Sequence, residues 1–312
     1  MSDQRNLYED VDQLRKALTK KNMEKEDEET LIKITAKNNL KQRLKIISQY
    51  KTTWGTDFLD DLKLHISGDF FDLLIGLYMN KYEYDAEQCH KSIEGLGTNE
   101  DTLIEILGTR PGWMLKKIMK EYKKKFKAEL KEEVNADTSG DFRELLLLLL
   151  KCNRSENKNP DKEKCKKIAI EIFNKDEKKL KTDVFNKYFE ISSPAELMII
   201  AREYEIENHS PLMKDIEDNF SGDASKLIKT VFKANISPSE YFATRIDYSL
   251  RGSGTKETKE KILNRIIVTR NEIDIPLIKK YYEKLYSKDL VEDIKEDTSG
   301  SYQNLLVAML NK

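Results

Sequence analysis

A Ser-Gly pair recurs four times along this chain of 312 residues, at intervals of 72, 82 and 78 residues (140−68, 222−140 and 300−222). Aligning the chain on these glycines places an isoleucine 22 residues before each one, a tyrosine 18 before and an acid seven before. The aligned residues are Gly68, Gly140, Gly222 and Gly300; Ile46, Ile118, Ile200 and Ile278; Tyr50, Tyr122, Tyr204 and Tyr282; and Asp61, Glu133, Asp215 and Asp293. Such self-similarity indicates four copies of one structural unit.

The pattern inside each unit is helical. Large apolar residues predominate at the second, fifth, sixth and ninth positions after each glycine, which is the i, i+3, i+4, i+7 spacing of one helix face. Strand patterns are almost absent. We therefore predict an all-α fold of four tandem repeats of about 70 residues, each with several short helices. The expected boundaries are 1–80, 81–155, 156–236 and 237–312.

Composition limits the compartment and the partners. Charged residues make up 36% of the chain, yet the net charge is only −1, so attraction to an anionic surface requires a local patch or a bound cation. The polar N-terminal segment does not resemble a signal peptide, and the apolar run Leu145–Leu150 is too short to span a bilayer. Three cysteines without metal-binding spacing fit a reducing compartment. We expect a cytoplasmic protein.

The second unit contains a turn that could bind a cation. In "SIEGLGTNED" (92–101) two glycines stand one residue apart, and positive φ at such residues lets successive carbonyl oxygens converge. Calcium favours six to eight oxygen ligands. The carbonyls of Ile93, Gly95 and Gly97 could supply three, and Asp137 in "ADTSGDF" could supply a carboxylate from 42 residues beyond Gly95 (137−95).

Ordinary helix capping is a second interpretation of these turns, and it does not exclude calcium ligation because both use the same turn. Thr98 with Asp101, and Thr138 with Asp141, match the spacing of a capping box at a helix start. By capping preference alone, Asp137 is more often a turn residue than a metal ligand. Phosphate binding is disfavoured because neither a P-loop lysine nor a preceding strand is present.

Four helical units with "GLGT…DTSGDF" in the second make the chain resemble the annexin family from about Leu7 to Lys312. The resemblance implies a curved disc of four five-helix repeats. It also implies Ca²⁺ sites on the convex face that bridge to anionic phospholipid, such as phosphatidylserine-like head groups. Such a protein is cytosolic at low calcium and a peripheral membrane protein when calcium rises.

Carried over residue by residue, the family's site is complete in two units. In the second unit it matches Ile93, Gly95, Gly97 and Asp137, and in the fourth it matches Leu250, Gly252, Gly254 and Asp297, with a longer spacing of 45 residues (297−252). The first unit has "TKKNMEKEDEET" and His65 instead, and the third has "KKLKTD" and Asn219, so we expect both to be silent. Leu96 and Trp113 are the expected membrane contacts; Trp113 is chosen because tryptophan favours the head-group region, and the equal alternative is an indole that lies on its own repeat.

Other functions have weaker support. "NKDEKKLKTDVF" lacks the sixth-position glycine and final glutamate of an EF-hand, and the three histidines show no zinc or catalytic spacing, so we expect no enzyme activity. The lysines of "KKIMKEYKKKFKAELK" (Lys116, Lys120, Lys123, Lys124, Lys127 and Lys131) form either a solvated face or a site for an anionic polymer or lipid head groups. Aromatic interleaving for nucleic acid is missing.

Two function classes remain open. One is calcium-dependent phospholipid binding. The other is a calcium-independent structural or cytoskeleton-associated scaffold that keeps the fold, and the two degenerate units lend it support. We expect a monomer in solution, with assembly on membranes left open.

Overall fold

The computed structural model describes residues 2–20, 23–95, 97–253 and 256–312. These form two compact units, one from Met1–Tyr84 with Phe242–Lys312 and one from Asp85–Tyr241. The first unit holds most of the first and fourth repeats, and the second holds most of the second and third. The boundaries fall inside helices α6 (Lys81–Ile93) and α16 (Pro238–Arg251).

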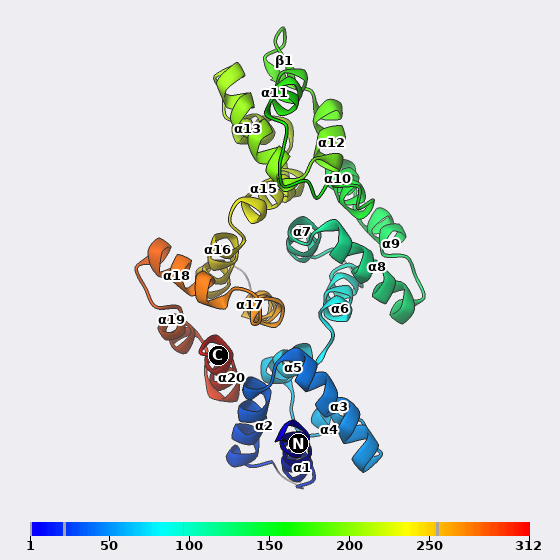
Figure 1. Ribbon diagram of the computed structural model, residues 1–312, viewed down its shortest axis with the longest axis vertical. Helices are drawn as coiled ribbons and strands as arrows, with labels where there is room; N and C mark the ends of the chain where they lie inside the picture. The colour runs from blue at the N-terminus through cyan, green and yellow to red at the C-terminus, as the bar shows by residue number, and fades with distance from the viewer. Residues whose placement is uncertain (1, 21–22, 96, 254–255) are drawn as a thin grey trace. The chain divides into compact units, whose positions relative to one another are not determined.

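In the described residues each repeat contributes five helices, which confirms the all-α, four-repeat prediction (Figure 1). The first has α1 (Ser2–Leu18), α2 (Lys25–Lys37), α3 (Leu40–Trp54), α4 (Phe58–Lys63) and α5 (Gly68–Tyr78). The second has α6, α7 (Glu100–Thr109), α8 (Gly112–Phe126), α9 (Leu130–Asp137) and α10 (Gly140–Leu150). The third has α11 (Lys162–Glu171), α12 (Thr182–Ile191), α13 (Pro194–Asn208), α14 (Leu212–Asn219) and α15 (Gly222–Ile236). The fourth has α16, α17 (Lys256–Arg270), α18 (Ile275–Tyr286), α19 (Leu290–Asp297) and α20 (Gly300–Leu310).

The third repeat adds a small β-hairpin where the second repeat has its glycine turn. Strands β1 (Phe173–Asn174) and β2 (Lys179–Leu180) pair antiparallel, with Phe173 opposite Leu180. This segment is the one that matches an EF-hand loop only in length.

The repeated tyrosine and acid form one hydrogen bond in every repeat. The phenol donates to the acid 11 residues later, at 2.7 Å in Tyr50–Asp61, 2.7 Å in Tyr204–Asp215 and 2.8 Å in Tyr282–Asp293, and the same bond joins Tyr122 to Glu133. Each bond ties the third helix of a repeat to the fourth. Burial raises the pKa of these phenols, to about 12 for Tyr50, so they remain donors at neutral pH. A bond to a carboxylate is stronger than a neutral one.

The repeated isoleucines explain the rest of the aligned pattern. Ile46, Ile118, Ile200 and Ile278 are all buried, as are most of the apolar residues that follow each Ser-Gly pair. Burying such a side chain contributes roughly 1.5–3 kcal/mol. The spacing therefore records which face of each helix meets the core.

In each unit, one helix pair that joins two repeats is built in the same way. In the second unit α7 packs on α15, and a Cβ added at Gly108 would lie 3.1 Å from the Thr230 side chain. In the first unit α5 packs on α17, and a Cβ at Gly76 would lie 2.7 Å from Val268. In both units the second helix of one repeat meets the fifth helix of another, and a glycine permits their close approach.

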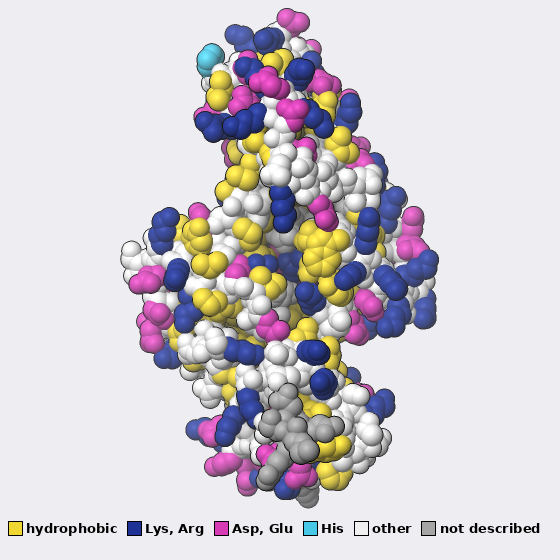
Figure 2. Space-filling model, in the orientation of Figure 1, with side chains coloured by type: hydrophobic (Ala, Val, Ile, Leu, Met, Phe, Trp, Pro, Cys, Tyr) yellow, Lys and Arg dark blue, Asp and Glu magenta, His cyan; other side chains and the backbone are white. Residues whose placement is uncertain are grey.

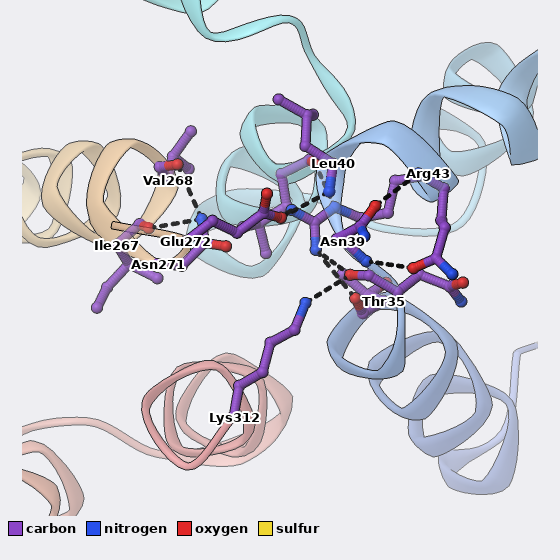
Figure 3. Close-up of polar contacts among 12 residues, drawn as sticks. Thr35, Asn39, Leu40, Arg43, Ile267, Val268, Asn271, Glu272 and Lys312 are labelled. Atoms are coloured by element: carbon purple, nitrogen blue, oxygen red, sulfur yellow. Dashed lines mark hydrogen bonds and ion pairs between the residues drawn. The ribbon is translucent and has the colours of Figure 1, made fainter. Parts of the chain in front are cut away.

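A buried arginine adds a polar link between the first and fourth repeats (Figure 3). The Arg43 guanidinium donates to the carbonyls of Leu77 (2.7 Å), Asn38 (2.6 Å) and Thr35 (3.2 Å). It also donates to the Glu272 carboxylate at 3.1 Å, an ion pair in which the arginine is 1% exposed. The Lys312 ammonium donates to the Asn38 carbonyl at 2.8 Å. The corresponding residues elsewhere are Leu115, Leu197 and Ile275, so this link belongs to the first repeat alone.

Candidate functional site

The glycine turn of the second repeat lies between the end of α6 and the start of α7. Gly95 and Gly97 have φ of 103° and 87°, the left-handed region that favours glycine, so the predicted positive φ is confirmed. The Asn99 amide donates to the Ser92 carbonyl at 2.7 Å and closes the turn. This bond ties the end of α6 to the start of α7.

The structure brings this turn to Asp137, the last residue of α9. The Thr98 hydroxyl, one residue after Gly97, donates to the Asp137 carboxylate at 2.6 Å and to its carbonyl at 3.1 Å. These residues are 39 apart in the sequence. The two predicted halves of the site therefore meet in space.

The predicted carbonyl donors are available. Among the described residues, no hydrogen bond is donated to the carbonyl oxygens of Ile93, Gly95 or Gly97. The same part of the chain contains no group of three acidic, histidine or cysteine side chains that could hold a metal. A cation here would be held by carbonyl oxygens and one carboxylate, which is a donor set that calcium accepts.

The two predicted capping boxes are wrong. The N-cap of α7 is Asn99, whose side chain accepts from the Thr102 amide at 3.0 Å, because Thr98 is engaged with the charged carboxylate of Asp137. The Thr138 hydroxyl donates to the Val134 carbonyl at 2.6 Å, so it caps the end of α9 rather than the start of α10.

The acid turn of the fourth repeat is built like that of the second. The Thr298 hydroxyl donates to the Ile294 carbonyl at 2.6 Å, as Thr138 does to Val134. Gly300 has φ of 65° and Gly140 has 57°. Asp297 is the last residue of α19 and is exposed.

The glycine turn of the fourth repeat is different. The Leu250 carbonyl, an expected cation ligand, accepts a hydrogen bond from the Lys259 ammonium at 2.9 Å. The φ of Gly252 is not in the positive region that favours glycine. A glycine is needed there because a Cβ would lie 2.4 Å from the Tyr248 carbonyl oxygen. Gly254, also an expected ligand, lies outside the described residues.

In three repeats, a side chain that the alignment of the repeats missed approaches the tyrosine–acid pair. Arg15 donates to Tyr50 (3.1 Å) and Asp61 (2.7 Å). His90 Nδ1 lies 3.0 Å from the Tyr122 hydroxyl. In the fourth repeat Arg251 donates to Tyr282 at 3.1 Å and also to Asp293 and Asp247. These residues come from α1, α6 and α16. Because the residue type changes from Arg to His, alignment by residue identity could not reveal them.

The first and third repeats lack a glycine turn joined to an acid in their described residues. In the first repeat the corresponding segment has no glycine in the sequence, and its Lys20 ammonium pairs with Glu24 (3.0 Å) and Asp27 (2.9 Å). In the third, the β-hairpin replaces the glycine turn, and the Asn219 amide donates to the Asp215 carbonyl at 2.7 Å.

The structure does not bring Trp113 to the glycine turn. Helices α7 and α10 both begin beside the site, and each extends about 15 Å from it. Trp113 follows the end of α7, and a Cβ at neighbouring Gly112 would lie 3.5 Å from Cys152, just past the end of α10. The indole is 45% exposed, but at the other end of these helices. Leu96 lies outside the described residues.

Among the described helices, none combines the length and apolar character needed to cross a bilayer.

Comparison with known proteins agrees with the repeat structure. The family model Annexin matches residues 9–77, 84–149 and 241–309, which leaves the third predicted repeat unmatched. Annexin A7 of Homo sapiens is 33% identical over 288 residues, which cover 92% of this chain and 58% of that protein. This chain thus spans little more than half of that relative.

Solved structures show the same fold. Annexin III has a TM-score of 0.91 and 32% identity, covering 97% of this chain and 93% of that one. The calcium-bound annexin (Sm)1 has a TM-score of 0.83 and 26% identity, covering 98% and 90%. Annexins are generally non-enzymatic proteins that bind phospholipid in a calcium-dependent manner. On the family model's matches, the repeats and these relatives, this chain belongs to the annexin family.

Proposed function

We propose that this protein attaches from the cytoplasm to membranes that contain anionic phospholipid, including phosphatidylserine-like head groups, when calcium rises. The observation that carries the proposal is the hydrogen bond from Thr98 to Asp137, which joins the glycine turn to the acid. The calcium ligands would be the carbonyls of Ile93, Gly95 and Gly97 and the Asp137 carboxylate. A solved relative is described as calcium-bound, in keeping with this assignment.

The ligand set makes binding conditional on lipid. One carboxylate gives a low charge count, and calcium affinity follows charge count and rigidity. A lipid phosphate or carboxylate would add anionic oxygens to the ion. By linkage, calcium and lipid then raise each other's affinity by the same factor. Attachment should therefore require both components.

The fourth repeat would provide a second, weaker site from Leu250, Gly252, Gly254 and Asp297. Calcium would have to displace the Lys259 ammonium, which lies 2.9 Å from the Leu250 oxygen. A cation already held at a ligand opposes another cation by repulsion and by competition for the same lone pairs. We therefore assign the principal site to the second repeat.

Co-sedimentation with phosphatidylserine vesicles over a calcium titration tests the proposal. The wild type should sediment with calcium and not without it, and the double variant Asp137→Ala, Asp297→Ala should remain in solution. Asp218→Ala is the matched control, because it removes one exposed acid from the corresponding turn of the third repeat. Vesicle binding by the double variant at wild-type calcium levels would refute the assignment.

A calcium-independent scaffold that works through protein contacts, including cytoskeletal ones, is the second candidate. It is favoured by the first and third repeats, where lysine pairing and a β-hairpin replace the glycine turn. Retention of partner binding by the double acid variant in a calcium chelator would support the scaffold. If the double acid variant binds neither vesicles nor cytoskeletal filaments in the chelator, the scaffold function is excluded.

A further inference from the structure

Helix α8 of the second repeat carries lysines along one exposed side. Lys116, Lys120, Lys123 and Lys127 recur at spacings of three or four residues, and Lys117 and Lys124 flank them; all six are exposed. The opposite side of the helix is buried, through Leu115, Ile118 and Tyr122. We call Lys116, Lys117, Lys120, Lys123, Lys124 and Lys127 the α8 lysine stripe. Lys131, grouped with them from the sequence, belongs to α9.

The fold does not require this charge. Gly112–Lys127 contains seven lysines and one glutamate, a net charge of +6 (7−1), in a chain whose net charge is −1. The corresponding segment of the third repeat, Pro194–His209, contains one arginine and four glutamates, a net charge of −3 (1−4). The same helix is formed with opposite charge in the two repeats.

Internal ion pairs neutralise only part of the stripe. Lys124 pairs with Glu121 at 3.3 Å, and Lys123 pairs with Glu129. Within the described part of the chain, Lys116, Lys120 and Lys127 form no ion pair with a carboxylate. Like charges four residues apart on a helix destabilise it slightly. Lys123 and Lys124 lie in the last turn, where the helix dipole favours cations, but Lys116 and Lys120 lie outside it. Helix stability therefore does not account for their charge, which points to a benefit in binding.

Trp113 lies on the same side of α8, at its N-terminal end. Helical rotation places it between Lys116 and Lys117, and the Lys117 ammonium is 5.2 Å from the centroid of the indole ring. Tryptophan favours the head-group region of a bilayer. Figure 2 shows dark-blue Lys and Arg side chains gathered over α8 and α9.

We propose that the α8 lysine stripe, with Trp113, is a calcium-independent docking surface for an anionic lipid bilayer. Basic side chains near such a surface each contribute attraction, and the stripe extends about 17 Å along the helix, at about 1.5 Å per residue from Lys116 to Lys127. Because the apolar side of α8 is already buried, the helix would rest on the head groups without inserting its backbone. Lipid is favoured over nucleic acid because Trp113 stands at one end and does not alternate with the lysines.

The test is vesicle co-sedimentation of the full chain in a calcium chelator at low salt, with phosphatidylserine in phosphatidylcholine. The wild type should bind, and added salt should release it because screening shortens the range of the attraction. The triple variant Lys116→Glu, Lys120→Glu, Lys127→Glu should lose about a hundredfold in partitioning. The matched control is Lys162→Glu, Lys164→Glu, Lys167→Glu, which makes the same charge change at exposed positions of α11. It should bind like the wild type.

Three outcomes would overturn the proposal. They are no binding by the wild type without calcium, equal loss in both triple variants, and binding to a sulfated glycan or acidic filament in place of vesicles. A Trp54→Phe background isolates the fluorescence of Trp113, which should shift to the blue on binding.

This surface can be separated from the calcium site. The α8 triple variant should keep calcium-dependent binding at high salt, and Asp137→Ala should keep binding in the chelator. Loss of both modes in the α8 variant, with its helical circular dichroism retained, would show that the stripe is not a separate surface.

Discussion

The second and fourth repeats build their acid turns alike but hold their glycine turns differently. Thr138 and Thr298 make the same hydrogen bond, both at 2.6 Å to the carbonyl four residues earlier. In the second repeat the glycine turn is joined to Asp137 through Thr98. In the fourth, a lysine ammonium lies on the Leu250 carbonyl, and the matching threonine, Thr255, lies outside the described residues.

The difference follows from the range of the contacts. The acid turn depends on bonds within four residues, so the repeated "DTSG" reproduces it. The glycine turn depends on a partner 39 residues away and on whichever charged side chains lie nearby. A local motif can therefore be retained while the site that it belongs to changes.

The largest expected effect comes from the acids taken singly. Asp137→Ala should raise the calcium concentration for half-maximal vesicle binding by about tenfold or more, because the one carboxylate in the proposed ligand set of the principal site is lost. Asp297→Ala should raise it by less, since the Lys259 ammonium already lies on the Leu250 carbonyl, a proposed ligand of that site. Calcium titrations with sedimentation measure both. A larger effect at Asp297 would reverse our ranking of the two repeats.

The tyrosine–acid bonds should differ in their contribution to stability. Asp293 is 7% exposed and Glu133 is 37% exposed, so the phenol bond of the fourth repeat is the more shielded from water, although Arg251 and Lys288 still donate to Asp293 once the phenol is lost. Tyr282→Phe should cost about 2 kcal/mol, and Tyr122→Phe about 1 kcal/mol or less. Urea unfolding of both variants gives the comparison, and equal losses would contradict the role of burial.

Removal of the Lys259 ammonium should raise the calcium affinity of the site proposed in the fourth repeat. Lys259→Met should lower the calcium concentration for vesicle binding by about fivefold, the lower end of ordinary coupling between sites. Lys280→Met, an exposed lysine of α18, is the control and should have no effect. If Lys259→Met weakens binding instead, the lysine supports the turn and does not compete with calcium.

The smallest effect is expected in acid. Burial alone would raise the pKa of Asp293, but hydrogen bonds from Tyr282, Lys288 and Arg251 outweigh burial and lower the pKa below its usual 3.8. A carboxylate with a lowered pKa stabilises the fold above the unfolded value of about 3.9. That stability is lost as pH falls through the folded pKa. Asp293→Asn should therefore be less stable than the wild type at pH 7, with a gap that narrows below pH 4.

Much of the fold could be predicted from residue type and spacing. Apolar periodicity identified the helices, and the aligned Ile118 and Tyr122 marked a buried face. The meaning of the aligned acid was not predicted, since only coordinates show that Tyr122 donates to Glu133. The capping box of Thr98 failed because Thr98 had a stronger acceptor in Asp137, which no local pattern includes, whereas that of Thr138 failed because its hydroxyl bonds back to the Val134 carbonyl.

One further repeated feature, a left-handed residue at the end of the third helix, cannot be recognised from residue type. Thirteen residues before each aligned glycine the backbone is left-handed, with φ of 72°, 59°, 54° and 54° at Gly55, Lys127, His209 and Ser287. Only the first of these residues prefers that conformation. The end of the third helix imposes it in the other repeats, because each cap amide bonds to the carbonyl four residues earlier.

Sequence alone determined the number of repeats, the helical class and the residue types present at each turn, because these depend on periodicity and local chemistry. Tertiary structure decided which turns meet an acid and which carbonyls remain open. Those outcomes depend on contacts between residues far apart in the chain, such as Thr98 with Asp137 and Arg43 with Glu272. Spacing can propose such contacts, but only packing brings the atoms within bonding distance.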